Sequence, residues 1–528
     1  MKLIRYIIIS CTVLLFAQCT DLSEVPYTFL SPNNYYNNGE ELGRSLTGVY
    51  DGYRDAFDGY NKYVMYLEVL TEFGSPAYAK DNMHLWNVWS DMNNADKMVI
   101  TNWDNAYDVI NRVNLVIGRG ADVEMDESLK QRFFAEARFL RAATYFNLVR
   151  MWGGVPIPET FTAGLDGLEV PRKSVDETYA YIIQDLEFCI QNLPKKSAYA
   201  SSDVWRASKG AAQSLLGDVY LTYADMSGDA SYYTKSRDVL SDVIGSGDYS
   251  LEPDFKDLWF WWNTNNKNGV ESVFELQFGS VSGQHNNNHV MFGVNITEYT
   301  LGCYMYRRFH PSIQHVATYS DSDARKEGTF LTKFNTTEKG NPSNILDTLV
   351  WLPEDKGFYP GTRGWKSAGP GNVKFYDRTP ESATLKLPQA QMYVIRYADV
   401  LMNYAEAANH VNGGPTAEAY AAINDVRNRA NLEDLPAGLS QTEFADAIFR
   451  EQGWELVGEA KLYYDEIRTD RIGNNVKAHV QYGNDEGIYM YVETPLEFVP
   501  SKDFLFKIPQ YDFDSNPALV QNPDNVSK

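Results

Sequence analysis

The feature that most constrains the fold is the segment from Ala135 to Glu159, which reads AEARFLRAATYFNLVRMWGGVPIPE. Its first part is mostly apolar and has helical spacing, which places Arg138, Tyr145 and Trp152 in one row along a helix. The two glycines that follow allow the backbone to leave a helix, and the two prolines after them cannot continue one. The sequence therefore predicts a long helix that ends at Trp152.

Helical spacing of apolar residues recurs along most of the chain. It predicts helices at residues 39–57, 103–118, 127–152, 175–193, 205–223, 231–244, 391–411, 416–430 and 441–468. The sequence QSLLGDVY, which starts at Gln213, contains the L-G-x-x-Y part of a tetratricopeptide helix. Its Gly217 follows Ala211 and Ala212, and such small residues let a partner helix approach closely. We therefore expect a mainly α fold built on tetratricopeptide-like helix pairs.

The region from 251 to 390 has a different character. It contains loop-forming clusters such as NTNNKNG, SGQHNNNH and YPGTRGWKSAGPGN, and the alternating residues 273–278 predict a strand. So long an irregular region in a compact protein is usually functional. The tail FKIPQYDFDSNPALVQNP is predicted to be non-helical because of its prolines. The expected organisation is a signal peptide at 1–18, an N-terminal helical region at 19–250, a loop-rich ligand-side region at 251–390 and a C-terminal helical region with a tail at 391–528.

The N-terminus has the layout of a secretory signal. Lys2 and Arg5 precede an apolar run that is too short to span a bilayer, and Cys19 follows it. A cysteine at the cleavage point is typical of lipoproteins, in which it becomes acylated and anchors the protein. A secreted protein without lipid is the alternative.

The charge and the cysteines narrow the possible partners and compartment. The net charge is −23 at pH 7, which disfavours nucleic acid as a partner. Of the four cysteines, Cys11 leaves with the signal and Cys19 would carry lipid, so Cys189 and Cys303 remain. They could form at most one disulfide, and two free thiols are the preferred interpretation.

Signals of catalysis are missing from the sequence. It contains no HExxH, P-loop, G-x-S-x-G or dinucleotide-binding pattern. His285 and His289 are separated by three asparagines that favour a loop, and Asp321 begins a sequence that lacks the glycine and glutamate of a calcium loop. We interpret it as a solvated turn before Arg325. We expect no catalytic residue, metal or cofactor, although paired carboxylates for glycoside hydrolysis stay open.

Aromatic residues make up 14% of the chain, and the 36 tyrosines outnumber the 26 phenylalanines. Rings beside Asn, Asp and Arg suit neutral glycans, because a ring packs on the C–H face of a sugar while polar groups meet its hydroxyls. Two clusters have this mixture, and any one member is about as consistent with packing as with ligand contact. The candidates are Asn82, Trp86, Asn87, Trp89 and Asp91 in the first cluster, and Trp262, Tyr304, Tyr306, Arg307 and Trp365 in the second. We expect core packing for Trp103, Tyr107, Trp152, Trp205 and Trp259, and a structural role for Arg138 and Arg141.

Several segments together resemble the SusD-like (RagB/SusD) outer-membrane lipoproteins of Bacteroidetes. They are the Tyr145-Phe146 pair with its WGGVP exit, and the C-terminal segments YVIRYADVLMNYAEAANHV and AYAAINDVRNRANLEDLP. The chain departs from the family pattern in REQGWELVGEAKLYYDEIRTDR, where Arg450 and Glu451 are reversed and Lys461 replaces an expected arginine.

The resemblance implies a surface-exposed, lipid-anchored binding protein of the outer membrane that makes and breaks no bonds. Such a protein captures an oligosaccharide and delivers it to a SusC-like TonB-dependent transporter, over which it acts as a hinged lid. The resemblance also implies that the cluster before Trp103 contributes to the ligand platform. A peptide-binding RagB-like uptake lipoprotein and a secreted glycosidase are the alternatives.

Overall fold

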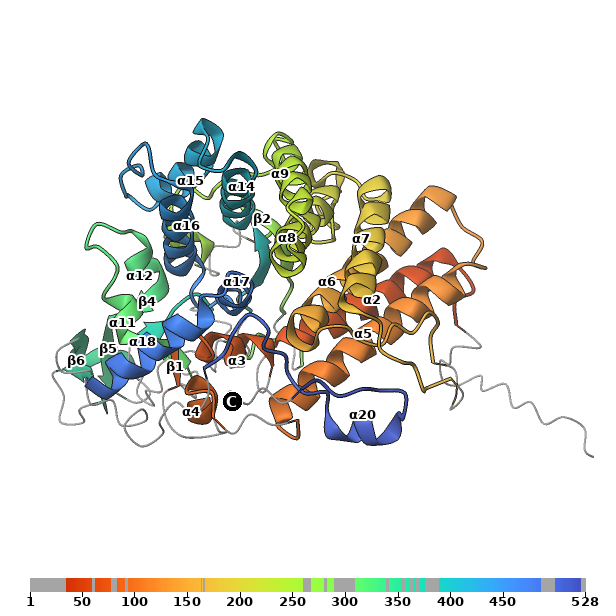
Figure 1. Ribbon diagram of the computed structural model, residues 1–528, viewed down its shortest axis with the longest axis horizontal. Coiled ribbons are helices and arrows are strands. Elements are labelled where there is room, and N and C mark those ends of the chain that lie inside the picture. Colours follow the sequence, from red (N-terminus) through yellow and green to blue (C-terminus); the bar gives the residue numbers. More distant parts are fainter. Residues whose placement is uncertain are drawn as a thin grey trace, which may run out of the picture.

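Helices dominate the structure, a computed structural model (Figure 1). It describes residues 35–58, 62–76, 83–90, 94–162, 164, 167–259, 267–279, 283–288, 309–338, 341–352, 357–359, 365–366, 370–375, 389–485 and 499–523. Short antiparallel strands accompany the helices, mostly between residues 272 and 396. The predicted mainly α fold class is therefore confirmed.

The helices form one continuous array, in which most pack against their neighbour along the chain. Its members are α2 (Gly39–Phe57), α5 (Lys97–Gly120), α6 (Glu127–Trp152), α7 (Val175–Asn192), α8 (Lys209–Ser227), α9 (Ser231–Ile244), α14 (Tyr397–Asn412), α15 (Ala417–Arg429) and α16 (Gln441–Leu456). Helices α15 and α16 both pack on α14. Helix α9 packs directly on α14 (Figure 1), although residues 251–390 intervene in the sequence. The irregular region therefore leaves and rejoins a scaffold that is continuous without it.

Helix α6 lies inside this array, with α2, α5, α7 and α8 around it. Asp126 caps its first turn by accepting a hydrogen bond from the Leu129 N–H. It ends at Trp152 as predicted, because Gly153 adopts a φ of 71°. Buried side chains occur on all its faces, so polar groups such as Glu136, which is 0% exposed, must find partners within the protein.

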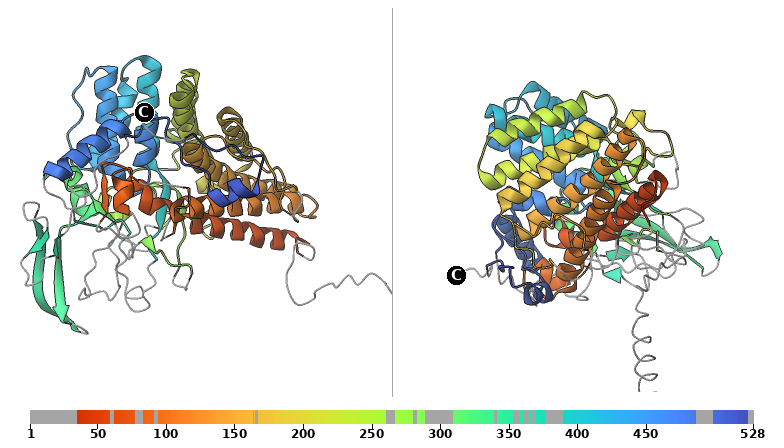
Figure 2. Two further views of the ribbon diagram at one scale, coloured as in Figure 1. Left: turned by 60° about the horizontal axis from the view of Figure 1, so that its bottom comes forward. Right: turned by 90° about the vertical axis from the view of Figure 1, so that its right-hand side faces the viewer.

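Among the described residues, the strands pair in four small sheets, all antiparallel. β1 (Gly74–Pro76) pairs with β3 (Phe309–Pro311), β2 (Ser272–Leu276) with β10 (Met392–Arg396), and β4 (Phe330–Leu331) with β9 (Gly371–Asn372). β5 (Lys333–Glu338), β6 (Asn341–Leu352), β7 (Gly357–Tyr359) and β8 (Trp365–Lys366) form the fourth sheet. In Figure 2 the β5–β6 hairpin extends away from the helices.

Several predicted boundaries are wrong. The helices predicted at 103–118 and 205–223 are α5 and α8, which span Lys97–Gly120 and Lys209–Ser227. The expected helix at 391–411 begins as strand β10, because its first residues pair with β2. The expected helix at 441–468 divides into α16 and α17 (Leu462–Arg468), since Gly458 and Ala460 adopt φ values of 86° and 61°. The tail contains a short helix, α20 (Gln510–Ser515), which begins directly after Pro509. A proline is tolerated at that position because the first helical N–H groups have no partner within the helix.

Candidate functional site

The β1–β3 sheet joins the two parts of the chain that carry the predicted ligand clusters. Gly74 pairs with Pro311, and Pro76 pairs with Phe309. In the sequence, β1 precedes the cluster at residues 79–97, and β3 directly follows the segment that contains Tyr304. The first cluster and the part of the second that contains Tyr304, Tyr306 and Arg307 are therefore attached to one base, although more than 200 residues separate them (309 − 76 = 233).

Two polar side chains hold this base in place. The Asn87 amide nitrogen donates to the carbonyl oxygens of Val69 at 2.6 Å and Gly74 at 3.2 Å. The Ser312 N–H donates to the Phe73 carbonyl at 2.8 Å, and its hydroxyl donates to the Glu72 carbonyl at 2.7 Å. Ser312 was not among the predicted residues. Its signal in the sequence is that of a helix cap, since it precedes the short helix α11 (Ile313–Val316).

The predicted platform tryptophans belong to the interior. Trp86 is 1% exposed and stacks on Phe506 with a centroid distance of 5.7 Å. Trp89 is 2% exposed, and its indole N–H donates to the Leu70 carbonyl at 3.0 Å. Asn87 is equally buried. The structure thus corrects the prediction for Trp86, Asn87 and Trp89, because their surfaces are occupied by protein and they support the base instead of facing a ligand.

The remaining candidates keep the status of predictions. Outside the described residues lie Asn82, Asp91, Trp262, Tyr304, Tyr306 and Arg307, together with Cys19 and Cys303. Trp365 belongs to β8, where its backbone pairs with that of Phe358. Cys189 is a buried free thiol that donates to the Ala135 carbonyl.

A further loop, residues 283–288, is fixed against the end of α2. The Asn287 backbone N–H and side-chain amide donate to the two carboxylate oxygens of Asp58 at 2.5 and 2.8 Å. The Asn288 amide donates to the Phe57 carbonyl at 3.1 Å. Burial raises the pKa of Asp58, although the bonds from Asn287 oppose this. Residues 283–287 are non-helical as predicted, whereas Asn288 is helical and His289 lies outside the described residues; His285 contacts Asn287 at 2.9 Å.

A buried ion network fixes the irregular region to the C-terminal helices. The Arg396 guanidinium contacts the carboxylates of Glu271, Glu455 and Glu459 at 2.7 to 2.8 Å. These four side chains are at most 2% exposed. Burial alone would raise the pKa of Glu459, but nearby cations, led by Arg396 and Lys374, lower it to about 2. Neutralising one member would leave another charge unpaired in the interior.

The predicted solvated turn before Arg325 is only half correct. Asp321 and Ser322 are exposed, but Asp323 is 4% exposed and contacts the Arg325 guanidinium at 2.8 Å. Arg325 also contacts Glu451 of α16 at 2.6 Å. The D-x-R segment therefore fixes the loop-rich region to α16, because the buried Arg325 guanidinium pairs with Asp323 of this region and with Glu451 of α16.

Arg138 and Arg141 have the expected structural role. Arg141 makes two hydrogen bonds to the Asp185 carboxylate, at 2.8 and 2.9 Å, and one to the Asn114 side-chain oxygen at 2.7 Å. The Arg138 guanidinium lies 4.2 Å from the ring centroid of Phe188. These contacts join α6 to α7 and α5.

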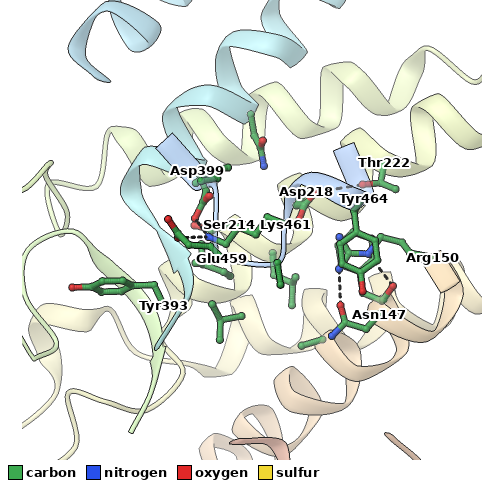
Figure 3. Close-up of a pocket in the computed structure, with 18 of the residues that line it drawn as sticks. Asn147, Arg150, Ser214, Asp218, Thr222, Tyr393, Asp399, Glu459, Lys461 and Tyr464 are labelled. Atoms are coloured by element: carbon green, nitrogen blue, oxygen red, sulfur yellow. Dashed lines mark hydrogen bonds and ion pairs between the residues drawn. The ribbon is translucent and has the colours of Figure 1, made fainter. Parts of the chain in front are cut away.

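Figure 3 shows an interior cavity of about 110 Å³ between α6, α8, β10, α14 and α17. At one end the Lys461 ammonium contacts Asp399 at 2.5 Å. At the other, Arg150 donates to Asn147 at 2.6 Å and lies 3.5 Å from the ring centroid of Tyr464. The cavity can hold a few water molecules, but ligand sites for larger molecules usually have about 300 to 1,000 Å³. An oligosaccharide does not fit there.

Strongly raised pKa values occur at Glu68, which is buried, and at Glu72, which is half-buried. Burial raises the pKa of Glu68 to about 7, against hydrogen bonds from the Ala460 and Gly458 backbone N–H groups. Burial also raises the pKa of Glu72 to about 7. Within the described ranges, no group of three or more His, Cys, Asp and Glu side chains is placed to hold a metal ion. In the same residues, no helix is long and apolar enough to cross a bilayer.

Comparison with known proteins agrees with this architecture. The family model described as "SusD family" matches residues 271–524, and a second, described as "Starch-binding associating with outer membrane", matches residues 37–221. The chain belongs to the SusD-like family. A SusD-like protein of Bacteroides ovatus is 25% identical to this chain, and the match covers 98% of this chain and 97% of that protein.

Solved structures of SusD-like proteins share the fold. A SusD homologue from Bacteroides thetaiotaomicron has a TM-score of 0.77 and 25% identity, over 93% of this chain and 98% of its own. A laminarin binding SusD-like protein has a TM-score of 0.71 and 25% identity, over 93% of this chain and all (100%) of its own. The family resemblance found in the sequence is therefore confirmed, and the matched residues 271–524 include the divergent REQGWELVGEAK segment.

Proposed function

We propose that this SusD-like chain is a surface-exposed lipoprotein that captures an oligosaccharide and delivers it to a SusC-like TonB-dependent transporter. The observation that carries the proposal is the β1–β3 pairing, which attaches the Trp- and Asn-rich segment after β1 and the Tyr-containing segment before β3 to one base. Family membership supports it, since the similar SusD-like proteins include one that binds laminarin. The proposed function includes no reaction in which covalent bonds are made or broken.

The proposed ligand contacts come from residues that follow β1 or belong to the region 251–390. They are Asn82, Asp91, Trp262, Tyr304, Tyr306, Arg307 and Trp365. Their rings would pack on the apolar faces of sugar units, while the amide, carboxylate and guanidinium groups would bond to hydroxyls. Trp86, Asn87 and Trp89 would act indirectly, by keeping the base in place.

Affinity electrophoresis in gels containing laminarin or starch tests the glycan ligand, with a soluble form that lacks residues 1–19. We expect at least one polysaccharide to retard the wild-type protein, and Tyr304→Ala to reduce the retardation without lowering the melting temperature. Tyr232→Ala, on α9, is the matched control and should migrate as wild type.

The Trp89→Ala variant shows whether Trp89 supports the β1–β3 base or contacts the ligand directly. It removes a buried ring, which should destabilise the protein by about 3–5 kcal/mol. If instead Trp89→Ala abolished glycan retention at an unchanged melting temperature, Trp89 would be a contact residue. Retention of peptides but of no glycan would favour the peptide-binding alternative, and turnover abolished by one Asp or Glu substitution would favour a glycosidase.

The anchor and the transporter need separate measurements. We expect fatty-acid labelling of the wild-type protein and none in Cys19→Ala, which should leave the membrane fraction. We also expect a TonB-dependent transporter to co-purify with the wild-type protein. Membrane retention of both forms without labelling would contradict the lipid anchor.

A further inference from the structure

A groove of about 840 Å³ lies between the start of α5, the segment that follows the WGGVP turn and the C-terminal tail. We name it the tail groove. Its lining includes Trp103, Asp104, Phe161, Leu168, Asp512 and Asn516. Residues of α20 help to line it, and Figure 1 shows α20 apart from β1 and β6.

Hydrogen bonds fix both walls of the tail groove. The Tyr107 hydroxyl donates to the Pro156 carbonyl at 3.0 Å, and the Asn114 amide donates to the Pro158 carbonyl at 2.9 Å. On the other side, the Asn516 amide donates to the Val170 carbonyl at 3.0 Å. A groove with fixed walls is preorganised, so a ligand would not have to order it on binding.

The charged side chains in the described lining of the tail groove are all acidic. This lining contains the carboxyls of Asp104, Glu159 and Asp512, and no Lys or Arg. Burial raises the pKa values of both Asp104 and Asp512, and the charge of Asp512 raises that of Asp104 further. The nearby Arg172 donates its N–H groups to the Trp152, Gly154 and Val520 carbonyls instead. A positively charged ligand would therefore be attracted to the groove, because it would offset the negative charge of these carboxylates.

The aromatic rings in the described lining of the tail groove already pack against other residues of the protein. Trp103 is 4% exposed and packs against Tyr107 and Trp152 at centroid distances of 4.9 and 5.4 Å. The Phe161 ring has the Arg119 guanidinium 5.0 Å from its centroid. These rings offer little open face to a sugar, which disfavours a saccharide as the occupant.

The exposed apolar residues near the groove favour a protein segment. Leu168 lines it and is 49% exposed, while Tyr511 on α20 is 45% exposed and Val520 after it is 71% exposed. They are half of the six exposed large hydrophobic residues in the described part of the chain. Leu168 lies in the groove itself, and Tyr511 and Val520 adjoin the lining residues Asp512 and Leu519 in the sequence, which suits an interaction surface.

We infer that the tail groove binds an extended segment of a partner protein in which Lys or Arg side chains alternate with apolar ones. The basic groups would pair with Asp104 and Asp512, and the apolar side chains would pack on Leu168, Tyr511 and Val520. The inference does not depend on which glycan is captured, because none of the lining residues of the tail groove is among the proposed glycan contacts.

Titration calorimetry with synthetic peptides on the full mature chain tests this inference. The probe is the amidated, acetylated pentapeptide Leu-Arg-Leu-Arg-Leu, and its partner probe has Glu in place of Arg. At low ionic strength we expect saturable binding of the Arg peptide only. Asp104→Asn combined with Asp512→Asn should weaken it by roughly tenfold or more, because each removed carboxylate leaves a cation unpaired.

The controls separate charge at the groove from charge in general. Asp122→Asn with Glu124→Gln also removes two carboxylates, both exposed and outside the groove, and should bind as wild type. Leu168→Lys, at an exposed position, should weaken binding without affecting folding. The inference is overturned if the Arg peptide does not bind, if it binds the groove variants as tightly as wild type, or if those variants lose oligosaccharide binding instead.

Discussion

Burial decides the role of individual side chains in this protein. Trp86 and Trp89 lie in a polar, Asn-rich segment that has the composition of a glycan platform, yet both are packed against aromatic residues of the tail. Glu68 is also buried, with 1% of its surface exposed, although its side chain is of a type that is normally charged. A buried carboxyl is more stable protonated, because the interior disfavours its charge.

Glu68 should therefore make stability depend on pH. Its folded-state pKa of about 7 exceeds the ordinary value of 4.5, so its contribution is fully present below pH 4.5 and is lost as the pH rises through 7. Glu68→Gln keeps an oxygen for the Ala460 N–H and removes the titration. We expect the variant to gain on the order of 3 kcal/mol relative to wild type between pH 4.5 and pH 8.

Urea unfolding of both proteins across this range measures that difference. Glu433→Gln, at an exposed position, is the control and should follow the wild-type profile. A constant difference between Glu68→Gln and wild type from pH 4.5 to pH 8 would show that Glu68 does not bind a proton more tightly in the folded state.

At the scale of elements, close contact between helices depends on glycine. A Cβ built on Gly217 of α8 would lie 2.4 Å from side-chain atoms of Leu240 on α9. The LLGDVY pattern indicated a close helix pair, but it did not identify the partner. Only the packing of α8 on α9 shows that Leu240 fills the space.

Gly217→Val should force α8 and α9 apart. We expect a destabilisation of about 1–3 kcal/mol from overpacking, measured by urea unfolding. Leu240→Ala in the same chain should recover part of the loss. Gly48→Val on α2 is the matched control, since a Cβ there meets no atom within 4 Å. Equal destabilisation by both glycine substitutions would attribute the effect to the helix backbone and not to the α8–α9 contact.

At the scale of the whole molecule, the tail closes the fold onto the WGGVP turn. The Trp152 indole N–H donates to the Lys507 carbonyl at 3.0 Å, and the Asn522 amide donates to the Trp152 carbonyl at 2.9 Å. Phe504 and Phe506 pack against Trp89 and Trp86. The tail therefore connects the first long helices with the base of the proposed ligand face.

Deletion of residues 504–528 should expose this interior. We expect the free energy of unfolding to fall by more than about 5 kcal/mol. The deletion removes two buried phenylalanines, together with Lys507 and Asn522, which bond to Trp152. A lower melting temperature and a red shift of tryptophan fluorescence would report it. Deletion of 524–528 alone is the control, and wild-type stability in the longer deletion would contradict a structural role of the tail.

Much of the fold follows from local signals. The ends of α2, α6 and α9 coincide with their predicted ends, because caps, glycines and apolar spacing act within a few residues. Strand β10 was missed because its pairing with β2 overrides helical spacing, and the break before α17 was missed because Gly458 and Ala460 leave the helical conformation. Of the candidate site, the sequence indicated the aromatic segments but assigned Trp86 and Trp89 to the ligand.

The sequence by itself determined the family, the helical scaffold, the end of α6 at Trp152 and the structural role of Arg141. These depend on periodicity and on residue types that act locally. The tertiary structure alone decided that β1 pairs with β3, that Trp86 and Trp89 are interior, and that the tail forms a groove beside α5. The physical reason is that burial and pairing between distant residues depend on three-dimensional packing, which no local pattern records.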